Sequence, residues 1–226
     1  RDGSVVVSVG TQDLGTGTRT YVAAIVAEEL GLTLAAVTAR IGDSRLASAT
    51  ASGGSTTTAS LAPSVKDAAS KLRALLADRL AKTLGVPAER VRFASGRVAD
   101  ETDLQRSLSW KQACATLGAE GLSTHGVHQA DLASSGVHGA QAAKVRVDTL
   151  TGRVEVIKMV CMQDCGLPLN RMAIRSQIQG GMVQSLSYAL LEQRVIDAPS
   201  GWALTANLED YKIAHAFEIP EMVALI

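Results

Sequence analysis

Glutamine and glycine recur along one side of residues 176–191, a combination that could bind a polar ligand. At 3.6 residues per turn, one helical face carries Gln177, Gly181, Gln184 and Tyr188, where a solvated helix would carry Lys and Glu. Primary amides donate and accept together, which suits a neutral, heteroatom-rich ring better than a metal or an acid. The alternative is a tight helix crossing in which the glutamines have partners within the protein.

The opposite side of this stretch is apolar, and no charged residue lies between Arg175 and Glu192. Both sides are therefore predicted to be covered. Gly180 and Gly181 each cost about 1 kcal/mol relative to Ala inside a helix, so we expect something to approach this backbone closely. The apolar residues are Ile178, Met182, Leu186, Ala189 and Leu190.

A glycine-rich loop at residues 10–20 follows an expected strand at 4–9 and opens an expected helix at 20–30. Free N–H groups at the helix start, with glycines that permit close approach, predict a phosphate or oxyanion cradle. The pattern is neither GxGxxG nor GxxxxGK[ST], and a loop that only makes turns remains the alternative. The candidate residues are Gly15, Thr16, Gly17 and Thr18.

A second loop, residues 50–60, is small, neutral and rich in hydroxyl groups, and it opens a long helix that ends at Gly85. Its backbone N–H groups and hydroxyl oxygens could hold phosphate oxygens. A flexible linker is the alternative, but this loop joins a strand (residues 37–41) to a helix within continuous alternation, which favours a site. The candidate residues are Ser52, Gly53, Gly54, Ser55 and Thr56.

The cysteines and histidines do not predict a metal site. Three cysteines at irregular spacing indicate reduced, buried thiols rather than a disulfide framework or a zinc site. The histidines lie in a Gly/Ser-rich region where scattered polar loop residues are favoured over zinc ligands. The residues concerned are Cys114, Cys161, Cys165, His125, His128 and His138.

Composition indicates a well-buried globular protein. Of 226 residues, 46% are hydrophobic and 19% charged, and 22 basic residues balance 22 acidic ones, so no basic surface predicts nucleic acid binding. No apolar run is long enough for a membrane span. The hairpin-type turn Asp2-Gly3 has no strand before it, and residues 221–226 form a β-type segment without a polar stop. We therefore expect residues 1–226 to be one partial domain of a longer polypeptide.

The remaining pattern predicts an α+β fold with mixed sheets, packed helices, β-loop-α-β units and hairpins. Hairpins are expected around Gly96, around Thr151-Gly152 between strands 144–148 and 153–160, and around residues 199–201. Ser109 and Gln112 have capping-box spacing for a short helix, and Asn170 can cap the helix with the glutamines. Residues 119–139 are expected to be mostly loop.

Six segments in this order resemble the large subunit of molybdenum hydroxylases, the xanthine dehydrogenase and aldehyde oxidoreductase family: GTQDLGTGTRT, SGGSTTT, VDTLTGRVEV, QDCGLPLN, QIQGGMVQ and NLEDYKIAHAFEIPE. The resemblance implies part of a larger molybdenum-cofactor-binding domain. By resemblance, residues 15–18 and 52–56 contact phosphate and pterin oxygens of a molybdenum-molybdopterin cofactor, in bacterial members a molybdopterin cytosine dinucleotide. Gln177 and Gln184 reach the pterin edge, with Gly181 between them.

Three positions depart from the family pattern: Thr16 stands where many relatives have Gln, Ser185 where Gly is usual, and Ala214 where Pro is usual. The resemblance implies hydroxylation of an aldehyde or N-heteroaromatic small molecule, with water as oxygen source and a glutamate of a GxGE segment as general base. Residues 1–226 hold no such segment, so we assign no catalytic residue and expect this chain alone to be inactive. Iron–sulfur and flavin groups are expected only on partner domains or subunits.

Two other functions remain open. One is a non-catalytic truncated domain that keeps the fold for assembly without binding cofactor. The other is a nicotinamide-type nucleotide-binding module, which the missing GxGxxG pattern disfavours. We expect a cytoplasmic location, with the periplasm as the alternative, since the start of the sequence has no signal-peptide hydrophobic region.

Overall fold

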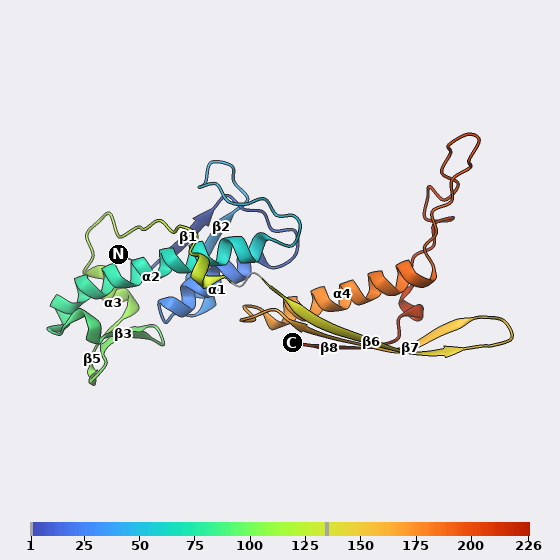
Figure 1. Cartoon of the computed structure of the whole chain (residues 1–226). Helices are drawn as coiled ribbons and strands as arrows, with labels where there is room; N and C mark the ends of the chain where they lie inside the picture. The colour runs from blue at the N-terminus through green and yellow to red at the C-terminus, as the bar shows by residue number, and fades with distance from the viewer. Residues whose placement is uncertain (1, 134–135) are drawn as a thin grey trace. The chain divides into compact units, whose positions relative to one another are not determined.

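The computed structural model describes residues 2–133 and 136–226. The chain divides into two compact units, Arg1–Ser135 and Gly136–Ile226, called here the N-terminal and the C-terminal unit. Figure 1 shows both, and each is described by itself. Helices and sheets occur in both units, and the sheet of the C-terminal unit is mixed, which confirms the predicted α+β class.

The N-terminal unit begins with a β-α-β arrangement. Strand β1 (Val5–Val9) pairs in parallel with β2 (Val37–Ile41), and helix α1 (Thr18–Glu29) connects them, as predicted. The helix ends before Gly31, whose φ of 63° suits glycine. A Cβ there would lie 2.5 Å from the Phe93 backbone carbon, so glycine also permits contact with the next sheet.

Helix α2 (Thr57–Leu84) packs along α1 and buries one apolar side. Glu29 at the end of α1 lies between Lys66 and Arg73 of α2, and both cations form ion pairs with it. Burial alone would raise the pKa of Glu29, but the cations outweigh it and lower the pKa. The buried residues of α2 are Leu61, Pro63, Val65, Ala69, Leu76, Leu80, Ala81 and Leu84.

A three-stranded antiparallel sheet follows, in the order β3 (Val91–Ala94), β4 (Arg97–Asp100), β5 (Asp103–Ser109). The hairpin around Gly96 is confirmed, while β5 was not predicted because its polar, exposed residues carry little hydrophobic alternation. Helix α3 (Trp110–Ala115) starts with the predicted capping box of Ser109 and Gln112.

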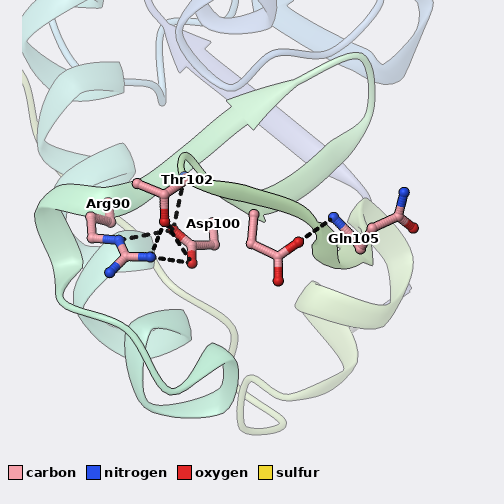
Figure 2. A network of polar contacts seen from close by, with 5 residues as sticks. Arg90, Asp100, Thr102 and Gln105 are labelled. Atoms are coloured by element: carbon pink, nitrogen blue, oxygen red, sulfur yellow. Dashed lines mark hydrogen bonds and ion pairs between the residues drawn. The ribbon is translucent and has the colours of Figure 1, made fainter.

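The turn between β4 and β5 is closed by a polar network that Figure 2 shows. Asp100 is 1% exposed and accepts hydrogen bonds from the Arg90 guanidinium and from the Thr102 N–H group. One step along the chain, the Gln105 N–H group donates to Asp103 Oδ1 at 3.1 Å. A buried carboxylate is thereby paired with a fixed cation, which makes this network structural.

Residues 119–133 then run along α2, mostly as loop, as predicted, with one short 3-10 turn (Ala130–Leu132). Of the rest of the predicted loop, residues 134 and 135 lie outside the described residues, and residues 138 and 139 begin the next strand. The Val127 N–H group donates to Asp67 Oδ2 at 2.9 Å, and the Thr124 hydroxyl donates to the Ala68 carbonyl oxygen at 2.8 Å. A Cβ on Gly126 would lie only 1.9 Å from the Ser64 carbonyl oxygen. This crossing therefore requires glycine.

The C-terminal unit is a three-stranded sheet with one long helix. Strands β6 (His138–Val147) and β7 (Val154–Asp164) form the predicted hairpin, and β8 (Glu221–Leu225) joins β7 in parallel. Helix α4 (Arg171–Leu190) packs against β7 and β8 (Figure 1). The Asn170 side chain caps it by accepting from the Ala173 N–H group at 3.0 Å, as expected.

Three features of this unit differ from the sequence expectations, and one is the end of β7, which lies at Asp164 rather than at the predicted position 160. Strand β6 starts six residues before the predicted position 144, because the alternation is hidden where it consists of Gly, Ala and Gln. The hairpin around residues 199–201 is reduced to one antiparallel bridge, Ile196 to Ala203. Both of these residues lie in a mostly exposed segment, so no buried face extends the pairing.

Candidate cofactor-binding site

The two glycine-rich loops of the N-terminal unit are hydrogen-bonded to each other. The Ser52 N–H group donates to Gln12 Oε1, and the Ser52 hydroxyl donates to the Gln12 carbonyl oxygen, each at 3.1 Å. Behind them, Gly10 N–H donates to the Ala47 carbonyl oxygen and Gly42 N–H to that of Thr11. The structure thus brings together two loops that the sequence presents separately.

In the first loop, the N–H groups expected to be free are not free. Asp13 Oδ1 accepts from the N–H groups of Gly15 (3.0 Å) and Gly17 (3.3 Å), and Oδ2 accepts from Arg19 N–H (3.1 Å). The bond from Arg19 N–H contributes most to lowering the Asp13 pKa. The expectation of an open N–H cradle here is wrong, because a carboxylate of the chain already occupies the start of α1.

The Thr16 hydroxyl and the glycine backbone of this loop are the groups that remain for contact with a ligand. Gly15 and Thr16 are exposed, Gly17 is half-buried with a φ of 85°, and Thr18 is 1% exposed. Contact with a cofactor through the Thr16 hydroxyl or the glycine backbone stays a prediction.

In the second loop, the N–H groups of Gly53 and Thr56 donate to the carbonyl oxygens of Ala51 and Gly53, so of residues 52–56 only the N–H groups of Gly54 and Ser55 have no acceptor among the described residues. Gly53, Gly54, Ser55 and Thr56 are exposed and Ser52 is half-buried. The Thr56 hydroxyl donates to the Gly53 carbonyl oxygen at 2.8 Å.

The first turn of α2, immediately after this loop, carries three N–H groups, those of Thr57, Thr58 and Ala59. None of the three has an acceptor within the part of the chain that the structure describes. They point beyond the start of a 28-residue helix, where its dipole favours an anion.

Three buried hydroxyl groups lie at the ends of the first loop and in α1. Thr11 and Thr18 are each 1% exposed and Tyr21 is 4% exposed, and none of their hydroxyls has a hydrogen-bond partner among the described residues. Burial raises the pKa of Tyr21, while the neighbouring hydroxyls of Thr58 and Thr18 act in the opposite direction. Buried polar atoms without partners are uncommon, so this group requires an explanation.

In the C-terminal unit, the polar face of α4 is uncovered. Gln177, Gly181, Gln184 and Tyr188 are all exposed, and a Cβ on Gly180 or Gly181 would meet nothing within 4 Å. Within this chain, the expectation that both sides of the helix are covered is wrong.

The apolar face of α4 is buried only in part. Met182 and Leu186 are 2% and 6% exposed, whereas Ala189 and Leu190 are exposed. The helix packs on its sheet along a narrow contact. Its other side carries the amides of Gln177 and Gln184 and two glycines with open space around them. The close neighbour predicted for these glycines is therefore not supplied by the described residues of this chain.

Two hydrogen bonds join the end of α4 to residues 211 and 214, and the sequence analysis did not predict them. The Tyr211 hydroxyl donates to Glu192 Oε2 at 2.7 Å, and the Ala214 N–H group donates to Oγ of buried Ser187 at 2.9 Å. Hydrogen bonds from the Ser187 and Tyr211 hydroxyls lower the pKa of Glu192. These bonds hold Tyr211 and Ala214 against the C-terminal end of α4. Only the small Ser within an apolar stretch could have signalled them.

No metal centre is formed by His, Cys, Asp or Glu in residues 2–133 and 136–226, since no three of them come together. Cys114 and Cys161 are buried and Cys165 is half-buried. His125 and His128 instead line a cavity of 680 Å³ between β1, α2 and residues 122–128. This cavity includes none of the candidate cofactor-binding residues.

The comparison with protein families identifies this arrangement. Residues 1–220 match the model of the molybdopterin cofactor-binding domain. The chain belongs to this family. It is 30% identical, over 223 residues, to the aldehyde oxidoreductase molybdenum-binding subunit PaoC of Escherichia coli strain K12, covering 98% of this chain and 29% of that protein. The resemblance seen in the six sequence segments is thereby confirmed.

Solved structures support the fold. The chain resembles quinoline 2-oxidoreductase from Pseudomonas putida 86 with a TM-score of 0.84 and 23% identity, over 99% of this chain and 29% of that one. CO dehydrogenase from Oligotropha carboxidovorans gives a TM-score of 0.86, also with 23% identity and the same shares of the two chains. The chain therefore spans under a third of the length of these relatives.

The residues present fit a molybdopterin cofactor. A phosphate-bearing ligand needs donors without competing carboxylates, and the start of α2 provides them. A pterin edge needs paired donors and acceptors, and the exposed amides of Gln177 and Gln184 provide those. No helix in the described ranges is long and apolar enough to cross a membrane.

Proposed function

We propose that this chain forms the cofactor-binding portion of a molybdenum hydroxylase, and that the cofactor is a molybdopterin, in its cytosine dinucleotide form. The observation that carries the proposal is the start of α2: its first-turn N–H groups have no acceptor among the described residues, and Ser52 fastens the preceding loop to Gln12. A dinucleotide extension adds phosphate oxygens, which are the acceptors such a helix start favours.

Each candidate segment has a role in this proposal. Within residues 52–56, phosphate oxygens are held by the N–H groups of Gly54 and Ser55 and by the Ser55 hydroxyl, because the other donors are taken. The first-turn N–H groups of α2 hold phosphate oxygens beside them. Residues 15–18 contact the cofactor through the Thr16 hydroxyl and through glycine backbone that permits close approach, since Asp13 occupies the N–H groups.

On α4, Gln177 and Gln184 hydrogen-bond the pterin edge, and Gly181 leaves room for a ring along the helix. The open space at Gly181 supports this role, because a side chain there would project from the face that carries both amides.

When bound, the molybdenum cofactor supplies the redox centre at which oxygen from water is added to the substrate. The substrate class we propose is an aldehyde or an N-heteroaromatic small molecule. The names of the relatives support this class: PaoC is an aldehyde oxidoreductase subunit, and quinoline is an N-heteroaromatic compound.

We propose no catalytic residue in this chain, and expect the chain alone to be inactive. The candidate residues are Gly, Ser, Thr and Gln, none of which titrates near neutral pH. The carboxylates beside the loops, Asp13 and Asp43, have pKa values below the ordinary range because of hydrogen bonds from Arg19 N–H and from Arg45. A general base needs a pKa nearer the working pH, so the base comes from outside these residues.

The partners that follow are iron–sulfur and FAD domains or subunits, which pass electrons onward. PaoC is a molybdenum-binding subunit, which supports a multi-subunit enzyme. We propose a cytoplasmic location. Residues 1–226 are proposed to form part of a larger cofactor-binding domain.

The experiment is a cofactor measurement on the assembled enzyme that carries this chain. Molybdenum, pterin and CMP are quantified after acid release, and we expect about one of each per chain. A pterin-to-CMP ratio far from one would reject the cytosine dinucleotide form. Absence of both molybdenum and pterin would favour the non-catalytic assembly domain instead.

A further inference from the structure

The cavity of 680 Å³ beside His125 and His128 runs along one edge of strand β1. All five residues of β1 line it, and none of the residues of β2 does. Within the described residues β1 pairs with β2 alone, so the backbone N–H and carbonyl groups on its other edge have no partner there. An unpaired edge of this kind is a template for one more strand.

The other sides of the cavity suit an apolar strand better than a charged ligand. No Asp, Glu, Lys or Arg among the described residues lines it, so a charged ligand would find no counter-ion. Residues 47–50 and 122–126 line its rim, and helix α2 contributes an apolar stripe at helical spacing. The residues of this α2 stripe are Leu61, Val65, Ala68, Ala69 and Leu72.

The size of the cavity matches a short strand. Each residue of a strand takes about 160 Å³, since it rises about 3.3 Å, lies about 4.8 Å from the neighbouring strand and fills a layer about 10 Å thick. The cavity therefore holds about four residues in extended form, nearly the length of β1.

The turn that leads into β1 indicates where the added strand comes from. Gly3 has a φ of 91°, and the Ser4 N–H group donates to Asp2 Oδ1 at 2.9 Å. The Trp110 ring N–H group fixes this turn by donating to the Gly3 carbonyl oxygen at 2.8 Å. In the β6–β7 hairpin, Gly152 also has a positive φ, 75°, and also precedes its strand by two residues. Glycine in this conformation is typical of turns that connect antiparallel strands.

We propose that the free edge of β1 binds an antiparallel strand of the same polypeptide, which enters β1 through the turn at Asp2 and Gly3 and forms a three-stranded sheet with β1 and β2. The added strand carries apolar side chains at alternate positions, because one of its faces continues the buried face of β1 and lies over the α2 stripe. This chain covers 29% of PaoC, which leaves room for such a segment in a longer polypeptide. The inference rests on the proposal that residues 1–226 are part of a larger domain, and not on the cofactor.

The test is hydrogen exchange, read by mass spectrometry, on the assembled enzyme that carries this chain. In a strand that is paired on one side only, about every second N–H group lacks a partner and exchanges fast. We expect all five N–H groups of Val5–Val9 to exchange at least about tenfold more slowly than N–H groups of an unpaired edge. Deleting about ten residues upstream of residue 1 in the same enzyme should remove the protection of about half of them.

Leu72→Trp and Leu75→Trp form a matched pair of variants on α2. Leu72 is half-buried and lines the cavity, whereas Leu75 is 43% exposed and does not line it. An indole ring in the cavity competes with the added strand, so Leu72→Trp should speed exchange in β1 about tenfold and lower the thermal midpoint of the enzyme. Leu75→Trp should change neither quantity.

Three results would overturn the inference. Fast exchange at about half of the β1 N–H groups in the unmodified enzyme would mean that the edge is unpaired. Protection that survives the deletion would assign the edge to a strand from elsewhere. A Leu72→Trp variant with unchanged exchange and a raised thermal midpoint would show that the cavity is empty. Molybdenum and pterin are measured on every sample, and a protected β1 in an enzyme without either would support this inference while contradicting the proposed function.

Discussion

Ser52 donates two hydrogen bonds of 3.1 Å to Gln12, 40 residues earlier in the sequence, one from its N–H group to Oε1 and one from its hydroxyl to the carbonyl oxygen. Both bonds join the two glycine-rich loops, so the pair sets the spacing of the loops. Loops are otherwise the most mobile parts of a fold, and a ligand that contacts both needs that spacing fixed. This pair leads to the first prediction.

Gln12→Ala should lower cofactor occupancy more than it lowers stability. The variant removes the acceptor of the Ser52 N–H group. Because this hydrogen bond is exposed to solvent, we expect a loss of at most about 1 kcal/mol in the free energy of unfolding. Molybdenum and pterin per chain, measured beside a denaturant titration, check this. Gln105→Ala is the matched control, because that side chain is exposed and forms no hydrogen bond within the described residues. Equal cofactor loss in both variants would contradict the prediction.

Gly181→Val should abolish cofactor retention with little effect on the fold. Nothing among the described residues lies within 4 Å of the added Cβ, and valine has a higher helix propensity than glycine, so the variant should not lose stability, while it blocks the polar face of α4. Leu186→Ala on the opposite, buried side is the comparison and should cost about 2–4 kcal/mol. If Leu186→Ala loses as much cofactor as Gly181→Val, the helix is merely being destabilised.

Gly126→Ala should destabilise the N-terminal unit by about 2–3 kcal/mol. A Cβ would lie 1.9 Å from the Ser64 carbonyl oxygen, so residues 122–128 must move away from α2. Gly118→Ala provides the control, since that glycine has open space around its Cβ position and no left-handed backbone. Thermal midpoints give the readout, and similar midpoints for the two variants would show that the loop is not held against the helix.

Acid should weaken the fold through two carboxylates of the N-terminal unit. The Arg19 N–H group holds the pKa of Asp13 below 3.8. For Asp100, burial acts upward, but Arg90 and the Thr102 N–H group outweigh it and lower the pKa. Both pKa values are lowered in the folded state, so the stabilisation they provide is present above pH 3.8 and is lost as pH falls through the lowered values.

Asp100→Asn isolates one of these contributions. It should reduce stability at pH 7 and flatten the acid side of the stability curve, because the variant has no charge to lose. Asp103→Asn, next along the same turn and exposed, is the control. Denaturant unfolding at pH 3, 5 and 7 gives the curves, and parallel curves for Asp100→Asn and the unmodified protein would contradict the assignment.

Turnover should be absent from this polypeptide alone, even with loaded cofactor and an artificial electron acceptor. The candidate residues carry no group that titrates near pH 7, and the neighbouring carboxylates are held ionised. Adding the polypeptide that carries a GxGE segment should restore oxidation of an aldehyde or N-heteroaromatic compound, and mutating its glutamate should remove it. Activity of residues 1–226 by themselves would show that the base lies within them.

Local signals made much of the fold predictable. The β-branched run before the first loop, the capping box at Ser109 and the Asn170 cap each depend on a few adjacent residues, and the structure confirms all three. Strand β5 and the start of β6 were missed because their stability comes from pairing with a neighbour, not from a hydrophobic pattern of their own.

The candidate site was predictable in composition but not in detail. Glycines and hydroxyls indicated both loops, yet their sequence gave no sign that Asp13 would occupy the first helix start. Nor could periodicity reveal whether the glutamine face of α4 would be covered, since that depends on which other polypeptide lies against it.

The most direct test of the central claim is a structure of the assembled enzyme with its cofactor bound, at a resolution that places phosphate and pterin atoms. We predict phosphate oxygens within about 3.2 Å of the N–H groups at the start of α2, and pterin heteroatoms at the same distance from the amides of Gln177 or Gln184. A structure in which protein covers both the α2 start and the glutamine face, with the cofactor elsewhere, would contradict the account.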